Sequence, residues 1–113
     1  MDIGIVDYKG RKVIEVSGDI DMHSSPALRT ELMSLINKKI SPVIVDFSKV
    51  SYIDSSGIAT FVEGLKGMKS YGGRLQLFAI PKGIMEIFSF SKLDKVFEIY
   101  GNIDEAINNK KTL

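Results

Sequence analysis

The chain has 113 residues, of which 44% are hydrophobic and 26% are charged, as in one ordinary soluble globular domain. Fifteen basic residues against fourteen acidic ones leave a formal net charge of +1, which disfavours direct binding of nucleic acid. The absence of cysteine excludes disulfides, thiolate metal sites and thiol nucleophiles. The amino terminus has no signal-peptide pattern, and no apolar stretch approaches the roughly 18 residues of a membrane span, so we expect a cytoplasmic protein without a membrane contact.

The first segment predicts a β-hairpin. Residues 11–17 alternate around β-branched side chains, and we expect the strand to end at Gly18. Residues 3–7 supply the hairpin partner through a turn at Lys9 and Gly10.

A helix and a buried strand follow. Ser25 and Pro26 suit a helix start, and the helix is expected to end near residues 38–39. Residues 43–47 form a nearly continuous apolar run, which is typical of a central strand covered on both faces. We interpret residues 48–54 as the connection to the next element.

The second predicted helix spans residues 56–69, and glycines 72 and 73 end it. Its apolar positions step by three and four, and they are expected to face the core: Ile58, Phe61, Val62, Leu65 and Met68. The outer face is expected to carry Glu63, Lys66 and Lys69.

The last third of the chain continues the alternation of strand and helix. Residues 74–80 are predicted to form a strand that Pro81 ends, and residues 96–100 are predicted to form a short last strand. Asn102 is positioned to cap a terminal helix. Between the two strands lies a third helix, whose predicted apolar face is Ile84, Met85, Ile87 and Phe88.

This order predicts one α/β domain over residues 1–113, with a mixed, mostly parallel sheet and about four helices. Residues 109–113 are expected to form a frayed tail. No linker, internal repeat or low-complexity segment interrupts the chain.

The segment Asp54-Ser55-Ser56-Gly57 precedes the second helix, where backbone N–H groups lack partners within the helix. Its simplest interpretation is capping by Asp54 or Ser55. A second interpretation is that Ser55 accepts a phosphate, because the helix dipole and the free N–H groups favour negative charge there. A phosphoserine adds about −1.5 to −2 charges, which a docked partner would encounter.

The chain resembles the STAS-domain anti-sigma-factor antagonists of bacteria over almost its whole length. The similarity includes Val50-Ser51-Tyr52-Ile53 directly before the Asp-Ser-Ser-Gly segment and the Gly72-Gly73 turn. It also includes Gly18-Asp19-Ile20-Asp21 and residues 93–99. Together these pieces, in this order, form a specific signal.

The resemblance implies a partner-switching role in transcription regulation. In that family, the unphosphorylated antagonist binds an anti-sigma factor with a histidine-kinase-like ATPase fold and so releases a sigma factor. The anti-sigma factor is also a serine kinase, whose acceptor corresponds to Ser55, and a PP2C-type phosphatase reverses the modification. The antagonist itself is a phosphoprotein, not an enzyme, and it needs no cofactor or metal.

The resemblance also implies a partner-binding surface made of Asp21, Asp54, Ser55, Ser56, Gly57 and Ile58. For Asp21, an Asx-type turn before the first helix is an equally good interpretation. The motif departs from the commoner family pattern, because Ile58-Ala59 stands where many members have Leu-Gly. The added methyl group changes how closely a partner backbone can approach.

Other constellations carry weaker signals. His23 is the only histidine and lies outside any nucleophile-elbow motif, so a hydrolase using Ser55 or Ser56 is a distant alternative. Asp46 and Asp54 lack a third metal ligand at useful spacing. Phe90 is the best candidate for an exposed apolar contact.

Two interpretations of the role keep the same fold. The first is the phosphorylation-controlled antagonist described above. The alternative is a STAS subunit of a larger complex, such as a stressosome-like scaffold or a lipid-transport ATPase, without a phosphorylation switch. The presence of Ser55 favours the first.

Overall fold

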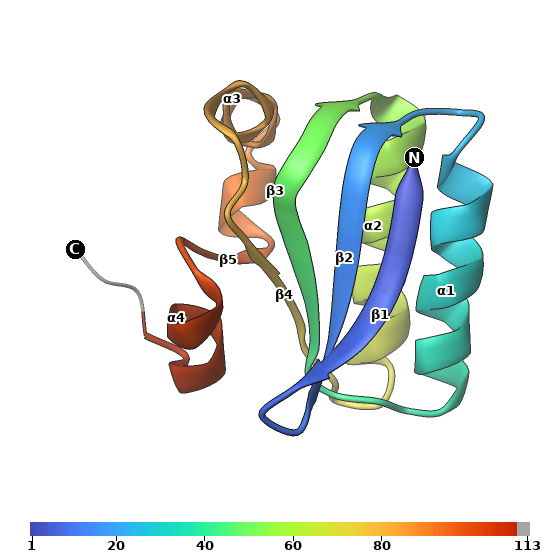
Figure 1. The fold of residues 1–113 in the computed structure, drawn as a ribbon, viewed down its shortest axis with the longest axis vertical. Coiled ribbons are helices and arrows are strands. Elements are labelled where there is room, and N and C mark those ends of the chain that lie inside the picture. Colours follow the sequence, from blue (N-terminus) through green and yellow to red (C-terminus); the bar gives the residue numbers. More distant parts are fainter. Residues whose placement is uncertain (111–113) are drawn as a thin grey trace.

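The computed structural model describes residues 1–110, within which five strands form one mixed sheet with helices on both faces (Figure 1). The elements are β1 (Asp2–Tyr8), β2 (Arg11–Ile20), α1 (Ser25–Asn37), β3 (Val43–Ile53), α2 (Ser55–Lys69), β4 (Leu75–Phe78), α3 (Lys82–Phe90), a 3-10 turn (Leu93–Lys95), β5 (Glu98–Tyr100) and α4 (Ile103–Asn108). The strands lie side by side in chain order, with β1 antiparallel to β2 and the later neighbours all parallel. The predicted α/β class and mostly parallel sheet are confirmed.

The hairpin turn is as predicted, but the end of the following strand is not. Lys9 and Gly10 both have positive φ, 51° and 79°, as a two-residue turn between twisted strands requires. β2 does not end at Gly18; it continues to Ile20. Gly18 adopts φ of 88° at a register irregularity in the pairing with β3, which only glycine accommodates without strain.

β3 is six residues longer than predicted, since residues 48–53 extend the strand and do not form a connection. Its second half pairs in parallel with the end of β2, from Ser17 opposite Lys49 to Ile20 opposite Ile53. Val50 and Ile53 are buried, while Ser51 and Tyr52 between them are exposed. Both strands therefore end together, at the edge where α2 begins.

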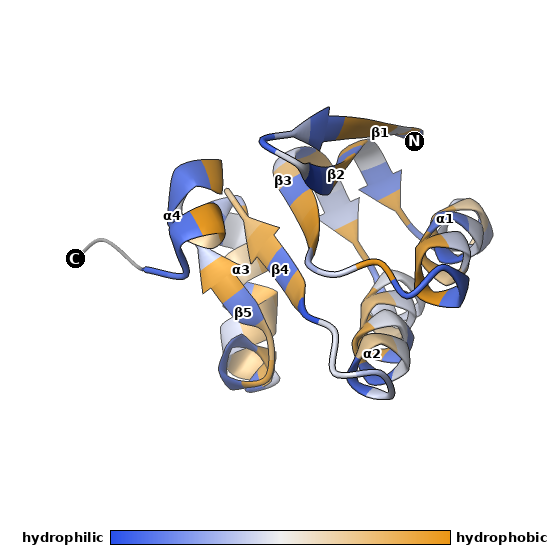
Figure 2. Cartoon of the chain, turned by 90° about the horizontal axis from the view of Figure 1, so that it is seen from below, coloured by the Kyte–Doolittle hydropathy of each residue, from blue (hydrophilic) through white to orange (hydrophobic). Residues whose placement is uncertain are grey.

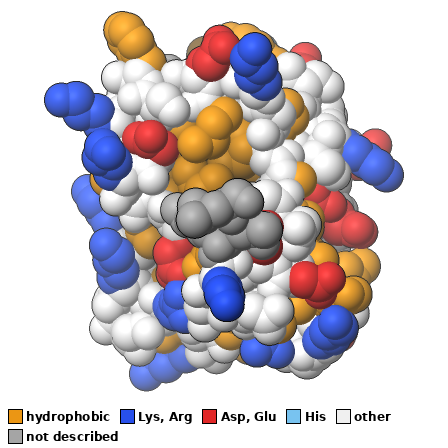
Figure 3. Space-filling model, turned by 90° about the vertical axis from the view of Figure 1, so that its left-hand side faces the viewer, with side chains coloured by type: hydrophobic (Ala, Val, Ile, Leu, Met, Phe, Trp, Pro, Cys, Tyr) orange, Lys and Arg blue, Asp and Glu red, His pale blue; other side chains and the backbone are white. Residues whose placement is uncertain are grey.

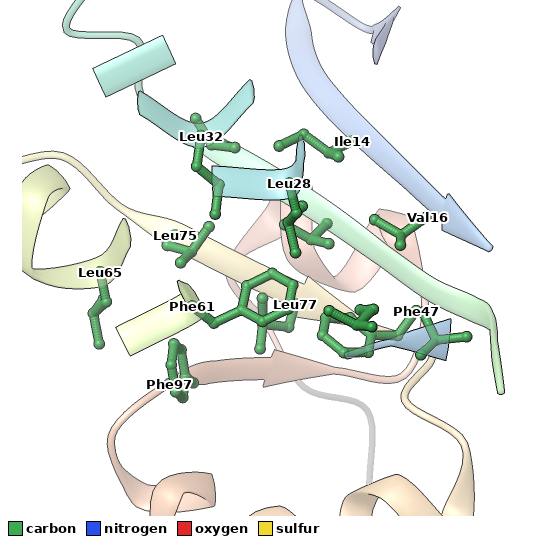
Figure 4. Packing of buried hydrophobic residues seen from close by; sticks show 14 of the residues in the cluster. Ile14, Val16, Leu28, Leu32, Phe47, Phe61, Leu65, Leu75, Leu77 and Phe97 are labelled. Atoms are coloured by element: carbon green, nitrogen blue, oxygen red, sulfur yellow. The ribbon is translucent and has the colours of Figure 1, made fainter. Parts of the chain in front are cut away.

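The main core lies between the sheet and helices α1, α2 and α3 (Figure 4). Phe47 on β3 connects the layers, because its ring lies 5.1 Å from the ring of Phe61 on α2 and 6.1 Å from that of Phe88 on α3. Glycines in α2 allow close helix packing: a Cβ at Gly67 would lie 2.9 Å from the side chain of Ile36 on α1. α4 covers part of the opposite face of the sheet, as the view along the strands shows (Figure 2).

Three details of the last third differ from prediction. β4 ends at Phe78, because Ala79 has φ of 57° and leaves the extended conformation. β5 begins only at Glu98, after the 3-10 turn. Ile87 is 41% exposed, because α3 packs through Ile84 and Phe88, which lie four residues apart on a different face of the helix.

Two other predictions for this region are confirmed, the exposure of Phe90 and the helix cap by Asn102. Phe90 is 94% exposed. The Asn102 side chain caps α4 by accepting the N–H of Glu105 at 2.9 Å. In the predicted tail, the N–H groups of Asn109 and Lys110 donate to carbonyls of α4, and residues 111–113 lie outside the described part. Within residues 1–110, every helix is too short or too polar to cross a bilayer.

Candidate functional site

The Asp54-Ser55-Ser56-Gly57 segment lies where β3 passes directly into α2, at the carboxyl end of the parallel strands. The end of β2 is its immediate neighbour, because the N–H of Asp54 donates to the carbonyl of Ile20 at 3.1 Å. Residues 18–21 and 54–57, two of the segments that carry the family resemblance, therefore lie next to each other at one edge of the sheet. Parallel pairing places them there, since it aligns the carboxyl ends of neighbouring strands.

Asp54 is the residue that caps α2. One carboxylate oxygen, Oδ1, accepts the N–H groups of Ser56 and Gly57 at 2.9 and 3.1 Å. The other, Oδ2, accepts the N–H of Met22 from the loop after β2, at 3.2 Å. A single side chain thus holds the helix start and the neighbouring loop in a fixed relation.

Ser55 is the first residue of α2, and it is exposed to solvent. Ser56 is half-buried, and its carbonyl accepts the hydroxyl of Thr60 at 3.0 Å. The expectation that free N–H groups would receive a phosphate on Ser55 needs correction, because Asp54 already occupies those of Ser56 and Gly57. A phosphate on Ser55 would share the positive end of the helix with a carboxylate and extend toward solvent.

Gly57 allows α2 to begin very close to the strands. A Cβ at this position would lie 2.7 Å from the side chain of Ile53 and 2.8 Å from both the side chain and the carbonyl oxygen of Ile20. Gly57 is therefore a packing requirement of the site. Ile58, next in the chain, is partly buried against the main core.

Asp21 forms the Asx-type turn that its position allows. Its Oδ1 accepts the N–H groups of His23 at 2.9 Å and Ser24 at 3.0 Å. These bonds, that of Ser24 first, lower the pKa of the Asp21 carboxyl below its ordinary value. Ser24 closes the turn, since its hydroxyl donates to the carbonyl of Asp19 at 2.7 Å. A contact of Asp21 with a partner stays a prediction.

The turn at Ser24 and the bond between Met22 and Asp54 were not part of the sequence-based prediction. The spacing of Asp21 and Ser24, directly before the helix start, is a local signal for the turn. The bond from Met22 to Asp54 joins residues 32 positions apart, and no local pattern indicates it. Knowing it requires the pairing of β2 with β3.

The weaker sequence candidates lie elsewhere or act structurally. Asp46 sits within β3, paired in register with Glu15, and accepts the N–H of Ser48 at 2.8 Å, so it does not join Asp54. His23 is exposed in the turn after Asp21. Among residues 1–110, no three His, Cys, Asp or Glu side chains gather as a metal site would require.

A second surface feature lies on the face that carries α3, β5 and α4. Hydrophobic side chains gather there in a hollow (Figure 3). Its lining includes Ala79, Ile80, Met85, Ile99 and Tyr100. None of these residues belongs to the segments around Ser55.

The family model of the STAS domain matches residues 3–106 of this chain. The chain belongs to the STAS-domain family. It is 30% identical over 86 residues, or 76% of this chain, to the anti-sigma-B factor antagonist of Bacillus subtilis, covering 78% of that protein.

Two solved structures show the same fold. The first is an anti-sigma factor antagonist from Mycobacterium paratuberculosis, with a TM-score of 0.86 and 24% identity, covering 96% of this chain and 92% of that one. The second is the phosphorylated form of the Bacillus cell fate determinant SpoIIAA, with a TM-score of 0.74 and 22% identity, covering 96% and 98%.

Proposed function

We propose that this STAS-domain protein is an anti-sigma-factor antagonist controlled by phosphorylation of Ser55. The unphosphorylated form binds an anti-sigma factor that is also a serine kinase, and the bound anti-sigma factor releases its sigma factor. Phosphorylation of Ser55 ends this binding. A PP2C-type phosphatase restores the active form, and the cycle runs in the cytoplasm. The kinase has a histidine-kinase-like ATPase fold, so ATP and metal belong to the partners.

The observation that carries the proposal is the exposed side chain of Ser55 on a rigid helix start. The Asp54 carboxylate caps the two N–H groups that follow the serine and accepts the N–H of Met22 from the neighbouring loop, and Gly57 allows the helix to pack against β2 and β3. A kinase can reach the hydroxyl without unfolding the domain. Of the two serines, Ser55 is favoured over Ser56 as the acceptor because Ser56 is half-buried.

The proposed switch works through charge. Three carboxylates, those of Asp19, Asp21 and Asp54, already lie at this edge of the sheet. A phosphate adds about −1.5 to −2 charges and changes the formal net charge from +1 to slightly negative. A hundredfold loss of affinity requires only about 2.7 kcal/mol, and a charge left unpaired at an interface costs several kcal/mol.

The comparisons support the proposal at two points. The Bacillus subtilis relative is named for antagonism of an anti-sigma-B factor. SpoIIAA, which shares the fold, has been solved in a phosphorylated form. Partner binding by Asp21, Asp54, Ser55, Ser56, Gly57 and Ile58 is part of this proposal.

The direct test is a kinase assay. The purified chain is incubated with ATP and each candidate anti-sigma factor from the same organism, and modified residues are mapped by mass spectrometry. We expect one phosphate on Ser55, none in Ser55→Ala, and unchanged modification in Ser56→Ala. Phosphate on Ser56 alone would show that Ser56, not Ser55, is the acceptor. If no candidate kinase phosphorylates the chain, the alternative of a scaffold subunit without a phosphorylation switch is favoured.

A further inference from the structure

Two large apolar side chains are exposed at the same edge as Ser55. Met22, in the loop after β2, is 65% exposed, and Tyr52, near the end of β3, is 51% exposed. The N–H of Met22 is bound to the carboxylate of Asp54, and Tyr52 precedes Asp54 by two residues. Both residues are therefore fixed to the frame that positions Ser55.

Single exposed apolar residues are common on protein surfaces, but these two flank one short segment. Tyr52 stands opposite Asp19 in the β2–β3 register, and Met22 follows Asp21 in the chain. Each exposed apolar residue thus has an acidic residue as a neighbour, Tyr52 across the strand pair and Met22 along the chain. A protein surface with an apolar recess bordered by hydrogen-bond donors or cations would complement this pattern.

We infer that Met22 and Tyr52 form an apolar rim that the anti-sigma factor covers when it binds. This inference rests on the proposed function, and it identifies contacts outside the Asp-Ser-Ser-Gly motif. Covering the rim buries apolar surface, which contributes affinity, and it excludes water from the surroundings of Ser55.

The rim also explains how one phosphate can greatly weaken binding of the anti-sigma factor. A phosphate in a wet interface keeps its hydration and costs little. In a contact from which apolar side chains have excluded water, the same phosphate loses hydration that the partner does not replace. The rim therefore determines the affinity of the unphosphorylated form and also the ratio between the two forms.

The chain offers a matched control. Val6 on β1 is 42% exposed, comparable to Tyr52. It pairs with Val13, which pairs with Ile44 near the start of β3. Ile44 is nine residues before Ile53, so Val6 lies roughly 30 Å along the strands from the Ser55 edge.

The test measures dissociation constants by titration calorimetry against the purified anti-sigma factor that phosphorylates the wild-type chain. The variants are Met22→Ser, Tyr52→Thr, the double variant and Val6→Ser. We expect each rim variant to bind about tenfold more weakly and Val6→Ser to bind within about twofold of wild type. Met22→Ser keeps the backbone N–H that binds Asp54, and thermal melts verify the fold. Tyr52→Phe, which keeps the ring, should bind nearly as wild type.

The second readout is the ratio of dissociation constants between the phosphorylated and unphosphorylated forms. We expect this ratio to be at least threefold smaller in the double variant than in wild type. If the double variant binds with wild-type affinity, or if Val6→Ser loses as much affinity as the rim variants, the inference about the rim is wrong. Neither result would contradict the phosphorylation switch. If no anti-sigma factor binds or phosphorylates the wild-type chain, the proposed function fails and the rim fails with it.

Discussion

At the scale of single residues, Asp54 joins the two halves of the site. Its carboxylate caps α2 and also receives the N–H of Met22. We expect Asp54→Ala to lower the free energy of unfolding by about 1–2 kcal/mol, as loss of a helix N-cap does. Asp54→Asn keeps an oxygen that can cap the helix, so its free energy of unfolding should fall much less. Urea denaturation measures both, and an Asp54→Ala variant as stable as wild type would contradict the role of the cap.

The turn at Asp21 predicts a pH dependence. Hydrogen bonds from Ser24 and His23 hold the pKa of the Asp21 carboxyl below its unfolded value of about 3.9. The ionised carboxylate therefore stabilises the fold fully above that value, and this contribution is lost as the pH falls through the lower folded pKa. Asp21→Asn keeps an acceptor but not the charge.

We expect wild type to be more stable than Asp21→Asn at neutral pH, with the difference disappearing as the pH falls well below about 4. The midpoints of urea denaturation of wild type and Asp21→Asn, taken between about pH 2 and pH 7, measure this difference in stability. A difference that stays constant down to about pH 2 would show that the carboxylate charge plays no part.

At the scale of elements, the position of α2 against β2 and β3 depends on Gly57. A Cβ there would meet Ile53 and Ile20, including a backbone carbonyl that cannot move aside cheaply. We expect Gly57→Ala to lose about 1–3 kcal/mol of unfolding free energy. Gly83→Ala in α3 is the matched control, because no atom lies within 4 Å of its added Cβ. Equal effects of the two substitutions would contradict the packing argument.

The elements that the sequence predicted well are those with local causes. The turn at Lys9 and Gly10 and the Asn102 cap depend on a few neighbouring residues. The second half of β3 was missed because Ser48, Lys49 and Ser51 interrupt the apolar run, and its extension depends on pairing with β2. Gly18 was misread as a strand end for the same reason, since a bulge within a paired strand and a strand end use the same residue.

In the candidate site, too, the features with local causes were predicted and those with tertiary causes were not. The Asp-Ser-Ser-Gly segment and its position before a helix were predicted from the sequence, and Asp54 as the cap was one of two options. The exposure of Ser55, Met22 and Tyr52 and the bond from the N–H of Met22 to Asp54 depend on tertiary contacts. These contacts connect residues that are distant in the chain.

At the scale of the whole molecule, the residues that form the core are separate from the site of the proposed switch. The main core lies between the sheet and helices α1, α2 and α3, whereas Ser55 is exposed at the edge where the strands end. We expect phosphorylation of Ser55 to change the free energy of unfolding by less than about 1 kcal/mol, because an exposed group interacts weakly with its neighbours in water. A large loss of stability by urea denaturation would show that the phosphate acts by unfolding the domain.

The most direct test of the phosphorylation switch is the affinity of the anti-sigma factor for the two forms of the chain. Calorimetric titration with the unphosphorylated chain and with chain phosphorylated only on Ser55 compares them under one set of conditions. We predict that the phosphorylated form binds at least a hundredfold more weakly, a difference of about 2.7 kcal/mol. Equal affinity of the two forms would contradict the switch.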